Sequence, residues 1–235
     1  CYQGHTSKTF NVHVRDDDKE YDRDYAEMDA MMHKAITIIQ FKVEGQLIKK
    51  HPEWNMKERL LLDKIDYKQG TIKLGGKEYP LNDTYFPTID PKDPYKLTHE
   101  EEDVVERLKN SFLGSERLQR HIRFLYTKGS LYKVYNGNLL YHGCVPLNED
   151  GSFMKVRIFD KTYSGKALYD ILEHYARKGY YSIDPQEKQR GEDILWFIWK
   201  NKHSPVFGKE RMATFERYFI DATETHEEPK NAYYR

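Results

Sequence analysis

One of the ten histidines stands where a turn of the chain could bring it to a ligand. Residues 136–137 are Asn-Gly, and a short apolar run then leads to His142, with Gly143 directly after it. Asn-Gly favours a two-residue hairpin turn because both turn residues need positive φ, so residues 132–135 and 138–141 are predicted to be neighbouring strands. His142 is then predicted to lie at the carboxyl end of a strand, where the sheet edges of α/β folds commonly bind ligands.

Two roles for His142 fit this position. One is a half-buried histidine whose ring hydrogen-bonds to the backbone. The other is a metal ligand, because neutral imidazole is the commonest metal-binding side chain. The spacing of the other histidines predicts no paired ligands, so position alone leaves both roles open.

A second group of chemically useful residues lies in residues 204–220. Its three cations of interest are Lys209, Arg211 and Arg217. Lysine and arginine can hold a phosphate group, and Gly208 would let the backbone approach a ligand closely. The alternative is that these cations form structural salt bridges with the neighbouring Glu210 and Glu216.

The remaining pattern predicts the elements that must position these residues. Helices are predicted at about 23–50, 55–63, 98–113, 115–126, 164–178 and 185–199, and strands at 71–74, 77–81, 132–135, 138–141 and 153–159. The first helix is expected to face the core with Met28, Met32, Ala35, Ile39, Val43 and Leu47. Thr98 and Glu101 form a capping-box pattern, Gly179 is expected to end its helix, and the Trp-Phe-Ile-Trp run at 196–199 is expected to be core.

Composition excludes several classes of protein. The 235 residues carry 38 Lys and Arg against 38 Asp and Glu, so the chain lacks the basic footprint of a nucleic-acid binder. No apolar run is long enough to span a membrane, and no signal-peptide pattern opens the chain. Two cysteines without a CxxC motif fit a reducing compartment, so a cytoplasmic protein is expected.

Three stretches resemble one known enzyme family. An apolar strand followed by His-Gly-x-x-Pro resembles the block of calcineurin-like metallophosphatases in which a strand-end histidine ligates a metal. The longer string over residues 138–151, Asn-Leu-Leu-Tyr-His-Gly-Cys-Val-Pro-Leu-Asn-Glu-Asp-Gly, is similar to the class III fructose-1,6-bisphosphatases of bacteria. Residues 33–56 and 204–220 resemble the same family, in a consistent order.

The resemblance implies a function and a set of roles. Members are expected to hydrolyse the 1-phosphate of fructose 1,6-bisphosphate in gluconeogenesis with two divalent metals, typically Mn²⁺, held about 3.5–4 Å apart around a bridging water. It assigns His142 as one metal ligand and offers Lys209, Arg211 and Arg217 as substrate-binding residues. No catalytic residue is assigned in this chain.

The resemblance also implies a domain organisation and a helix-rich α/β fold, a piece of a calcineurin-like metallophosphatase sandwich with a large helical insertion and short β-hairpins. Residues 1–130 are expected to be the insertion with a small hairpin, and residues 131–235 part of the metallophosphatase core, with the strands beside His142 in its central sheet. Because the sequence begins at Cys1 and the family's other metal-binding blocks are absent, we expect an inactive piece of a longer enzyme.

Three expectations complete the analysis. Unpaired sheet edges in such a piece favour self-association, so a homo-oligomer is possible on this sequence. A helical interaction module without catalysis, in which the His-Gly turn is incidental, is the first alternative function. A calcineurin-like phosphatase acting on another phosphoester is the second.

Overall fold

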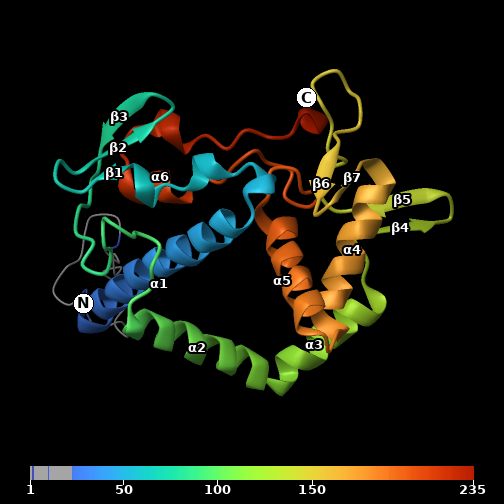
Figure 1. Ribbon diagram of the computed structural model, residues 1–235, viewed down its shortest axis with the longest axis horizontal. Coiled ribbons are helices and arrows are strands. Elements are labelled where there is room, and N and C mark those ends of the chain that lie inside the picture. Colours follow the sequence, from blue (N-terminus) through green and yellow to red (C-terminus); the bar gives the residue numbers. More distant parts are fainter. Residues whose placement is uncertain (1, 3–9, 11–22) are drawn as a thin grey trace. The chain divides into compact units, whose positions relative to one another are not determined.

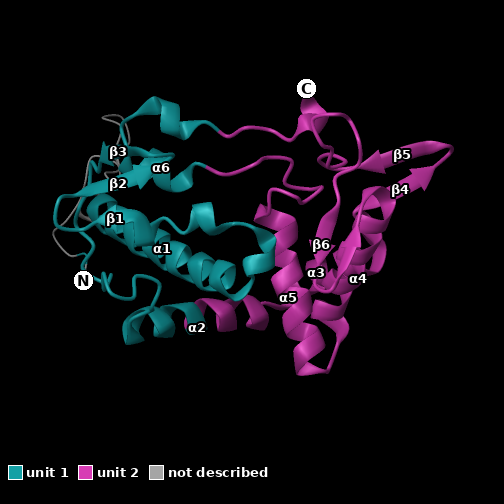
Figure 2. Ribbon diagram, turned by 45° about the horizontal axis from the view of Figure 1, so that its top comes forward, with its two compact units in different colours: residues 1–106, 213–227 teal, residues 107–212, 228–235 magenta. Residues whose placement is uncertain are grey.

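The computed structural model of the chain describes residues 2, 10 and 23–235, and these fall into two compact units (Figures 1 and 2). Unit 1 comprises residues 1–106 and 213–227, and unit 2 comprises residues 107–212 and 228–235. Each unit is therefore assembled from two separate stretches of sequence.

Helix α1 (Arg23–Lys50) in unit 1 has the predicted bounds, but its buried face differs from the prediction. Met28, Met32 and Val43 are 42%, 55% and 39% exposed, whereas Lys34 and Lys42 are 1% and 0% exposed. These lysines lie four residues either side of the buried Ile38 and so share its face. The predicted face was therefore wrong at half of its positions, because the burial of lysine depends on partners that the apolar pattern does not reveal.

Both buried lysines contact residues of the segment 83–101. The Nζ of Lys34 donates to Asp83 Oδ1 at 2.8 Å, and the Nζ of Lys42 lies 2.6 Å from Glu101 Oε2 and donates to the carbonyl of Thr88 at 2.6 Å. Burial lowers the pKa of Lys34, and its hydrogen bond to Asp83 partly offsets this effect. The two ion pairs hold residues 83–101 against α1.

The predicted capping box is confirmed at the start of helix α2 (His99–Gly114). The backbone N–H of Glu101 donates to Thr98 Oγ1 at 3.3 Å, and Glu101 Oε2 accepts from the N–H of Thr98 at 2.9 Å. Since the same carboxylate oxygen also meets Lys42, the cap is neutralised by a charge from another helix.

Short turns and a small sheet connect these helices. The helix predicted at 55–63 is replaced by 3₁₀ turns, η1 (Pro52–Trp54), η2 (Lys57–Arg59) and η3 (Leu62–Lys64). Asn55 has φ +53°, a left-handed conformation that interrupts a continuous helix. Strands β1 (Ile65–Asp66), β2 (Thr71–Leu74) and β3 (Lys77–Pro80) form an antiparallel sheet in that order, and β2 and β3 confirm the predicted hairpin.

Helix α6 (Thr214–Phe219) and turn η4 (Thr223–His226) complete unit 1. Phe215 and Phe219 are fully buried, and their rings lie 5.4 Å from those of Phe41 and Phe86. The buried cluster consists of Tyr2, Phe10, Ala30, Ile38, Leu61, Leu62, Ile65, Ile72, Leu81, Phe86, Ile89, Tyr95, Phe215, Phe219 and Ile220. An aromatic-rich core of this kind buries large apolar areas per residue.

Unit 2 begins within α2 at residue 107 and continues into helix α3 (Glu116–Lys128). Ser115 caps α3, and its Oγ accepts from the N–H of Leu118 at 3.4 Å. Strands β4 (Tyr132–Tyr135) and β5 (Asn138–Tyr141) form the predicted hairpin, and a second hairpin joins β6 (Val156–Ile158) to β7 (Lys161–Tyr163). The strand predicted at 153–159 is therefore shorter, because Phe159 takes φ +51° and turns the chain.

Helices α4 (Gly165–Tyr181) and α5 (Pro185–Lys200) pack closely against each other. A Cβ on Gly191 would lie 2.2 Å from the backbone nitrogen of Gly179, so neither position has room for a side chain. The prediction that Gly179 ends its helix was wrong, because this glycine serves the helix crossing. Trp199 was also wrongly expected in the core, since it is 59% exposed.

The mixed α/β class is confirmed, with helices dominant. In the described part of the chain the strands form one three-stranded and two two-stranded sheets, all antiparallel, and a calcineurin-like sandwich is not seen there. Turn η5 (Ala232–Tyr234) lies near the carboxyl end. None of the helices in this described part combines the length and apolar character that crossing a lipid bilayer requires.

Candidate functional site

His142 follows β5 directly, as predicted, and its side chain is exposed. Asn136 and Gly137 have φ +49° and +75°, the conformation of the two central residues in a type I′ turn. This turn sets the register in which Tyr132 pairs with Tyr141 at the base of the hairpin. The hairpin therefore delivers His142 to its base, at the point where the chain turns away.

The turn after His142 is held against the segment that follows α5. The N–H of Cys144 donates to the carbonyl of Pro205 at 2.7 Å. Gly143 has φ +94°, and a Cβ there would lie 2.2 Å from the same carbonyl oxygen, so the approach requires glycine. Burial raises the pKa of the Cys144 thiol to about 11. Two stretches that sequence analysis had singled out separately are thus in backbone contact.

A third stretch, near the carboxyl end, joins this junction. Asn231 is buried, donates its N–H to the carbonyl of Gly208 at 3.0 Å, and accepts the N–H of Leu147 on its Oδ1 at 3.1 Å. The hydroxyl of Tyr233 hydrogen-bonds to that of Tyr141, the residue before His142. Sequence analysis missed Asn231, and no local pattern marks it, because both of its long-range partners come from tertiary folding.

The three predicted substrate-binding cations do not all belong to this junction. Lys209 lies in it and pairs with Glu228, with 2.5 Å between Nζ and Oε2. Arg211 also belongs to unit 2, whereas Arg217 belongs to unit 1, where it donates to the carbonyl of His226 at 3.1 Å.

Glu210 and Glu216, the glutamates of the salt-bridge alternative, each have an arginine partner from elsewhere in the sequence. Glu216 is fully buried and pairs with Arg59 at 2.7 Å, and Glu210 lies 3.5 Å from Arg235.

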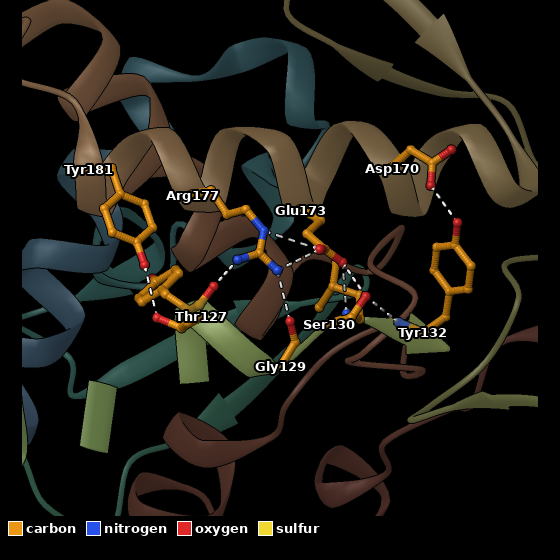
Figure 3. Close-up of polar contacts among 10 residues, drawn as sticks. Thr127, Gly129, Ser130, Tyr132, Asp170, Glu173, Arg177 and Tyr181 are labelled. Atoms are coloured by element: carbon orange, nitrogen blue, oxygen red, sulfur yellow. Dashed lines mark hydrogen bonds and ion pairs between the residues drawn. The ribbon is translucent and has the colours of Figure 1, made fainter. Parts of the chain in front are cut away.

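A polar network fixes the base of the hairpin to α4 (Figure 3). Arg177 donates to the carbonyl of Tyr126 in the last turn of α3, to the carbonyl of Gly129 in the connection before β4, and to Glu173 Oε1 at 2.7 Å. Glu173 Oε2 in turn accepts from the hydroxyl of Ser130 at 2.6 Å and from the N–H of Leu131 at 3.0 Å. The four-residue spacing of Glu173 and Arg177 on a predicted helix is a signal that sequence analysis could have used.

The hydrogen bonds of this network favour the ionised form of Glu173. Burial by itself raises the pKa of Glu173, but the hydrogen bonds from Ser130, Arg177 and Leu131 together lower it below its usual range. Nearby, the hydroxyl of Tyr132 donates to Asp170 at 2.8 Å. These groups lie in an open pocket of about 530 Å³, lined by Ser130, Tyr132, Lys133, Val134, Lys166, Asp170, Glu173, His174 and Arg177.

The described residues do not by themselves form a metal site. Within residues 2, 10 and 23–235, no three or more His, Cys, Asp or Glu side chains are grouped so that they could hold a metal ion. A structural or catalytic metal ordinarily takes three or four protein ligands. A metal at His142 would therefore need ligands beyond those that these residues supply.

The sequence matches one family profile and a set of similar proteins that carry the same name. The profile of the Firmicute fructose-1,6-bisphosphatase family matches residues 1–235. The chain is 52% identical over 233 residues to a protein of Clostridium beijerinckii named fructose-1,6-bisphosphatase class 3 1, a match covering 99% of this chain and 35% of the relative.

Two further relatives carry the name fructose-1,6-bisphosphatase class 3. The Clostridium tetani protein is 56% identical over 218 residues, covering 92% of this chain and 33% of the relative. The Clostridioides difficile protein is 58% identical over 207 residues, covering 88% and 31%. The chain thus spans about a third of the length of the curated relatives it matches. No solved structure matches it significantly.

Proposed function

Because the chain belongs to the Firmicute fructose-1,6-bisphosphatase family, we propose that it is part of a phosphatase that hydrolyses the 1-phosphate of fructose 1,6-bisphosphate in gluconeogenesis. The observation that carries this proposal is the family match over residues 1–235. The tertiary contact between the His142 turn and residues 204–210 supports it, because it joins the two stretches whose residue types suit metal and phosphate binding.

His142 is the proposed metal ligand of this chain. Its exposed position at the end of β5 leaves the imidazole accessible to an ion. The metal would be Mn²⁺, as one of a pair of divalent ions, and when bound it would act as a Lewis acid on the phosphate. The described residues offer no complete ligand set, and the chain spans about a third of its relatives' length. We therefore propose that the other ligands come from the rest of the longer protein. The chain alone is then expected to be inactive.

Lys209, Arg211 and Arg217 are the proposed substrate-binding residues. Lys209 is the best supported, because it lies in the same junction as His142, where it pairs with Glu228. A substrate phosphate would share this ammonium group with Glu228, and charge-assisted contacts of this kind are the strong ones. Arg217 belongs to unit 1, so its part in substrate binding is proposed from the family resemblance alone.

Three further features belong to the proposal. The parent fold would contain a calcineurin-like sandwich, with residues 1–130 as an insertion and residues 131–235 contributing to the core. The protein would act in the cytoplasm, which fits a phosphatase of a soluble metabolite. It would form homo-oligomers through strand edges that pair with no further strand in the described part of the chain.

Phosphate release from fructose 1,6-bisphosphate with Mn²⁺ tests the proposal. The gene's full reading frame, its His142→Ala variant and the 235-residue chain are compared, with His121→Ala as the matched control because His121 is an exposed histidine on α3. We expect activity in the full reading frame and in the control, and a loss of about a hundredfold or more in His142→Ala. Mn²⁺ binding followed by electron paramagnetic resonance reports the loss of a ligand, and circular dichroism of the same variant reports whether the fold is kept.

The same assay decides between the alternatives. Phosphate release from other phosphoesters but not from fructose 1,6-bisphosphate would favour a related phosphatase of different specificity. No release and no Mn²⁺ binding by the full reading frame would favour a non-catalytic interaction module. Full activity in His142→Ala would remove His142 from the metal site.

A further inference from the structure

Residues 228–235 contact both of the stretches that meet at the candidate site. We call these eight residues the clamp segment. It contacts residues 208–210 on one side and residues 141–149 on the other, and all three stretches belong to unit 2. The clamp segment is therefore a connection between the His142 turn and Lys209, in addition to the direct backbone contact described above.

The clamp segment fixes the backbone around Lys209. The N–H of Asn231 donates to the carbonyl of Gly208 at 3.0 Å, and the N–H of Glu210 donates to the carbonyl of Pro229 at 2.7 Å. These two bonds pair the segments as in an antiparallel ladder, with one bridge between them. The position of Lys209 in the chain thus depends on the clamp segment.

Asn231 also fixes the His142 turn, through its side chain. It is 5% exposed, and its Oδ1 accepts the N–H of Leu147 at 3.1 Å and the N–H of Tyr233 at 3.0 Å. The second of these bonds caps turn η5 and orients the amide. The hydroxyl of Tyr233 in turn hydrogen-bonds to that of Tyr141, the residue before His142. The turn is thus held at both of its ends.

Arg235 makes a similar connection with charge. It lies 2.9 Å from Glu149 Oε1 and 3.5 Å from Glu210 Oε1. These three side chains are all about half exposed or more, and exposed ion pairs contribute little to stability. The bonds of Asn231 are buried, and a buried N–H that loses its acceptor is costly. Asn231 is therefore the residue of the clamp segment on which the junction depends most.

We propose that Asn231 is a positioning residue, which holds His142 and Lys209 at a fixed separation. This inference rests on the proposed function, in which His142 ligates a divalent metal and Lys209 binds the substrate phosphate. Asn231 acts through the backbone of its neighbours, with its own N–H on the Lys209 side and its Oδ1 on the His142 side. Groups that act together from two separate loops need such support, because a displacement of about 1 Å can cost a hundredfold in rate.

Substitution of Asn231 in the gene's full reading frame tests the proposal. Asn231→Leu keeps a similar volume and removes the acceptor of both N–H groups, whereas Asn231→Asp keeps an acceptor in the same place. We expect Asn231→Leu to weaken Mn²⁺ binding, followed by electron paramagnetic resonance, by about tenfold or more, and to lower kcat by a similar factor. Hydrogen exchange in peptides covering residues 142–148 should become faster. Asn231→Asp should restore all three readouts.

Asp184→Ala is the matched control. It removes the capping acceptor of α5, which lies outside the junction, so it should lower the urea midpoint without changing Mn²⁺ binding or kcat. If Asn231→Leu lowered the urea midpoint in the same way but kept its Mn²⁺ affinity, kcat and slow exchange, Asn231 would be an ordinary cap and the inference would be overturned.

A second variant decides the matter if Asn231→Leu does not fold. Tyr233→Phe removes only the hydroxyl bond to Tyr141, and it should weaken Mn²⁺ binding by about fivefold. Unchanged affinity in this variant would overturn the inference. A wild-type full reading frame that binds no Mn²⁺ would overturn the proposed function and this inference together, whereas normal binding by both wild type and Asn231→Leu would overturn this inference alone.

Discussion

The two units treat charge and apolar surface in opposite ways. Unit 1 buries the side chains of Lys34 and Lys42 completely, although burying an unpaired ammonium group is very costly. Unit 2 leaves Val134 and Leu139 mostly in water, although covering them would be favourable. Each unit thus contains residues whose burial or exposure is the opposite of what their hydropathy alone predicts.

The difference lies in the partners that each unit can supply. In unit 1, Asp83, Glu101 and the carbonyl of Thr88 are within hydrogen-bond distance of the two lysines. In unit 2, the described residues provide a pocket under the hairpin but nothing that fills it. Burial is therefore decided by the complementary groups nearby, and not by residue type alone.

Removing one buried charge in unit 1 should produce the largest effect. Lys42→Met leaves the buried carboxylate of Glu101 without its counter-ion, and breaking a buried pair in this way costs about 3–5 kcal/mol. Urea denaturation followed by circular dichroism measures the loss. Lys49→Met on the same helix is the control, because the side chain of Lys49 is 45% exposed, and it should cost no more than about 1 kcal/mol. Equal losses in the two variants would show that the buried pair of Lys42 stabilises the fold no more than the exposed pair of Lys49.

The helix crossing of unit 2 should be the next most sensitive position. Gly191→Ala would place a methyl group 2.2 Å from the backbone nitrogen of Gly179, and overpacking against backbone that cannot yield costs about 3 kcal/mol. Thermal unfolding measures the change. Gly114→Ala is the control, since nothing lies within 4 Å of the added atom, and it should raise stability by up to about 1 kcal/mol. A stabilised Gly191→Ala variant would contradict the close crossing.

The N-caps of α4 and α5 offer a smaller contrast. Asp184 accepts the N–H of Glu187 at 2.8 Å, whereas Ser164 makes no side-chain capping bond. Asp184→Ala should therefore lower the free energy of unfolding by about 1 kcal/mol, and Ser164→Ala by clearly less. Urea midpoints of the two variants, measured side by side, decide the matter, and an equal shift would count against the cap geometry.

Adding a charge to the hairpin should have the smallest effect. Val134→Lys in the 235-residue chain is expected to change the free energy of unfolding by no more than about 0.5 kcal/mol, because the side chain is 63% exposed there. The same denaturation experiment measures it. A loss of several kcal/mol would show that Val134 is buried in the chain in solution and would remove the contrast between the units.

Local signals predicted the elements well. The bounds of α1, the hairpin of β2 and β3, the capping box of α2 and the Asn-Gly hairpin before His142 all depend on residues close in sequence. Their success follows from turn and cap chemistry that acts within a few residues. The position of His142 at a strand end was predictable for the same reason.

Failures occurred where distant groups set the outcome. Gly179 resembles a helix stop, yet it faces Gly191 across a helix crossing. Met28 and Met32 resemble core residues, yet their neighbours on α1 are buried instead, because Asp83 and Glu101 arrive to neutralise lysine. Local periodicity contains no information about either partner.

The sequence by itself determined the family, the kinds of element and the place of His142 at the end of a strand. Turn residues and caps act within a few residues of the chain, and the family match depends on the order of the residues alone. Only the tertiary structure decided that the His142 turn meets Pro205 and that Asn231 joins Gly208 to Leu147. It also decided that Lys209 and Arg217 belong to different units, and that β4 and β5 pair only with each other within the described residues. Contacts between residues far apart in the chain arise from packing and complementary charge, and these depend on the whole fold.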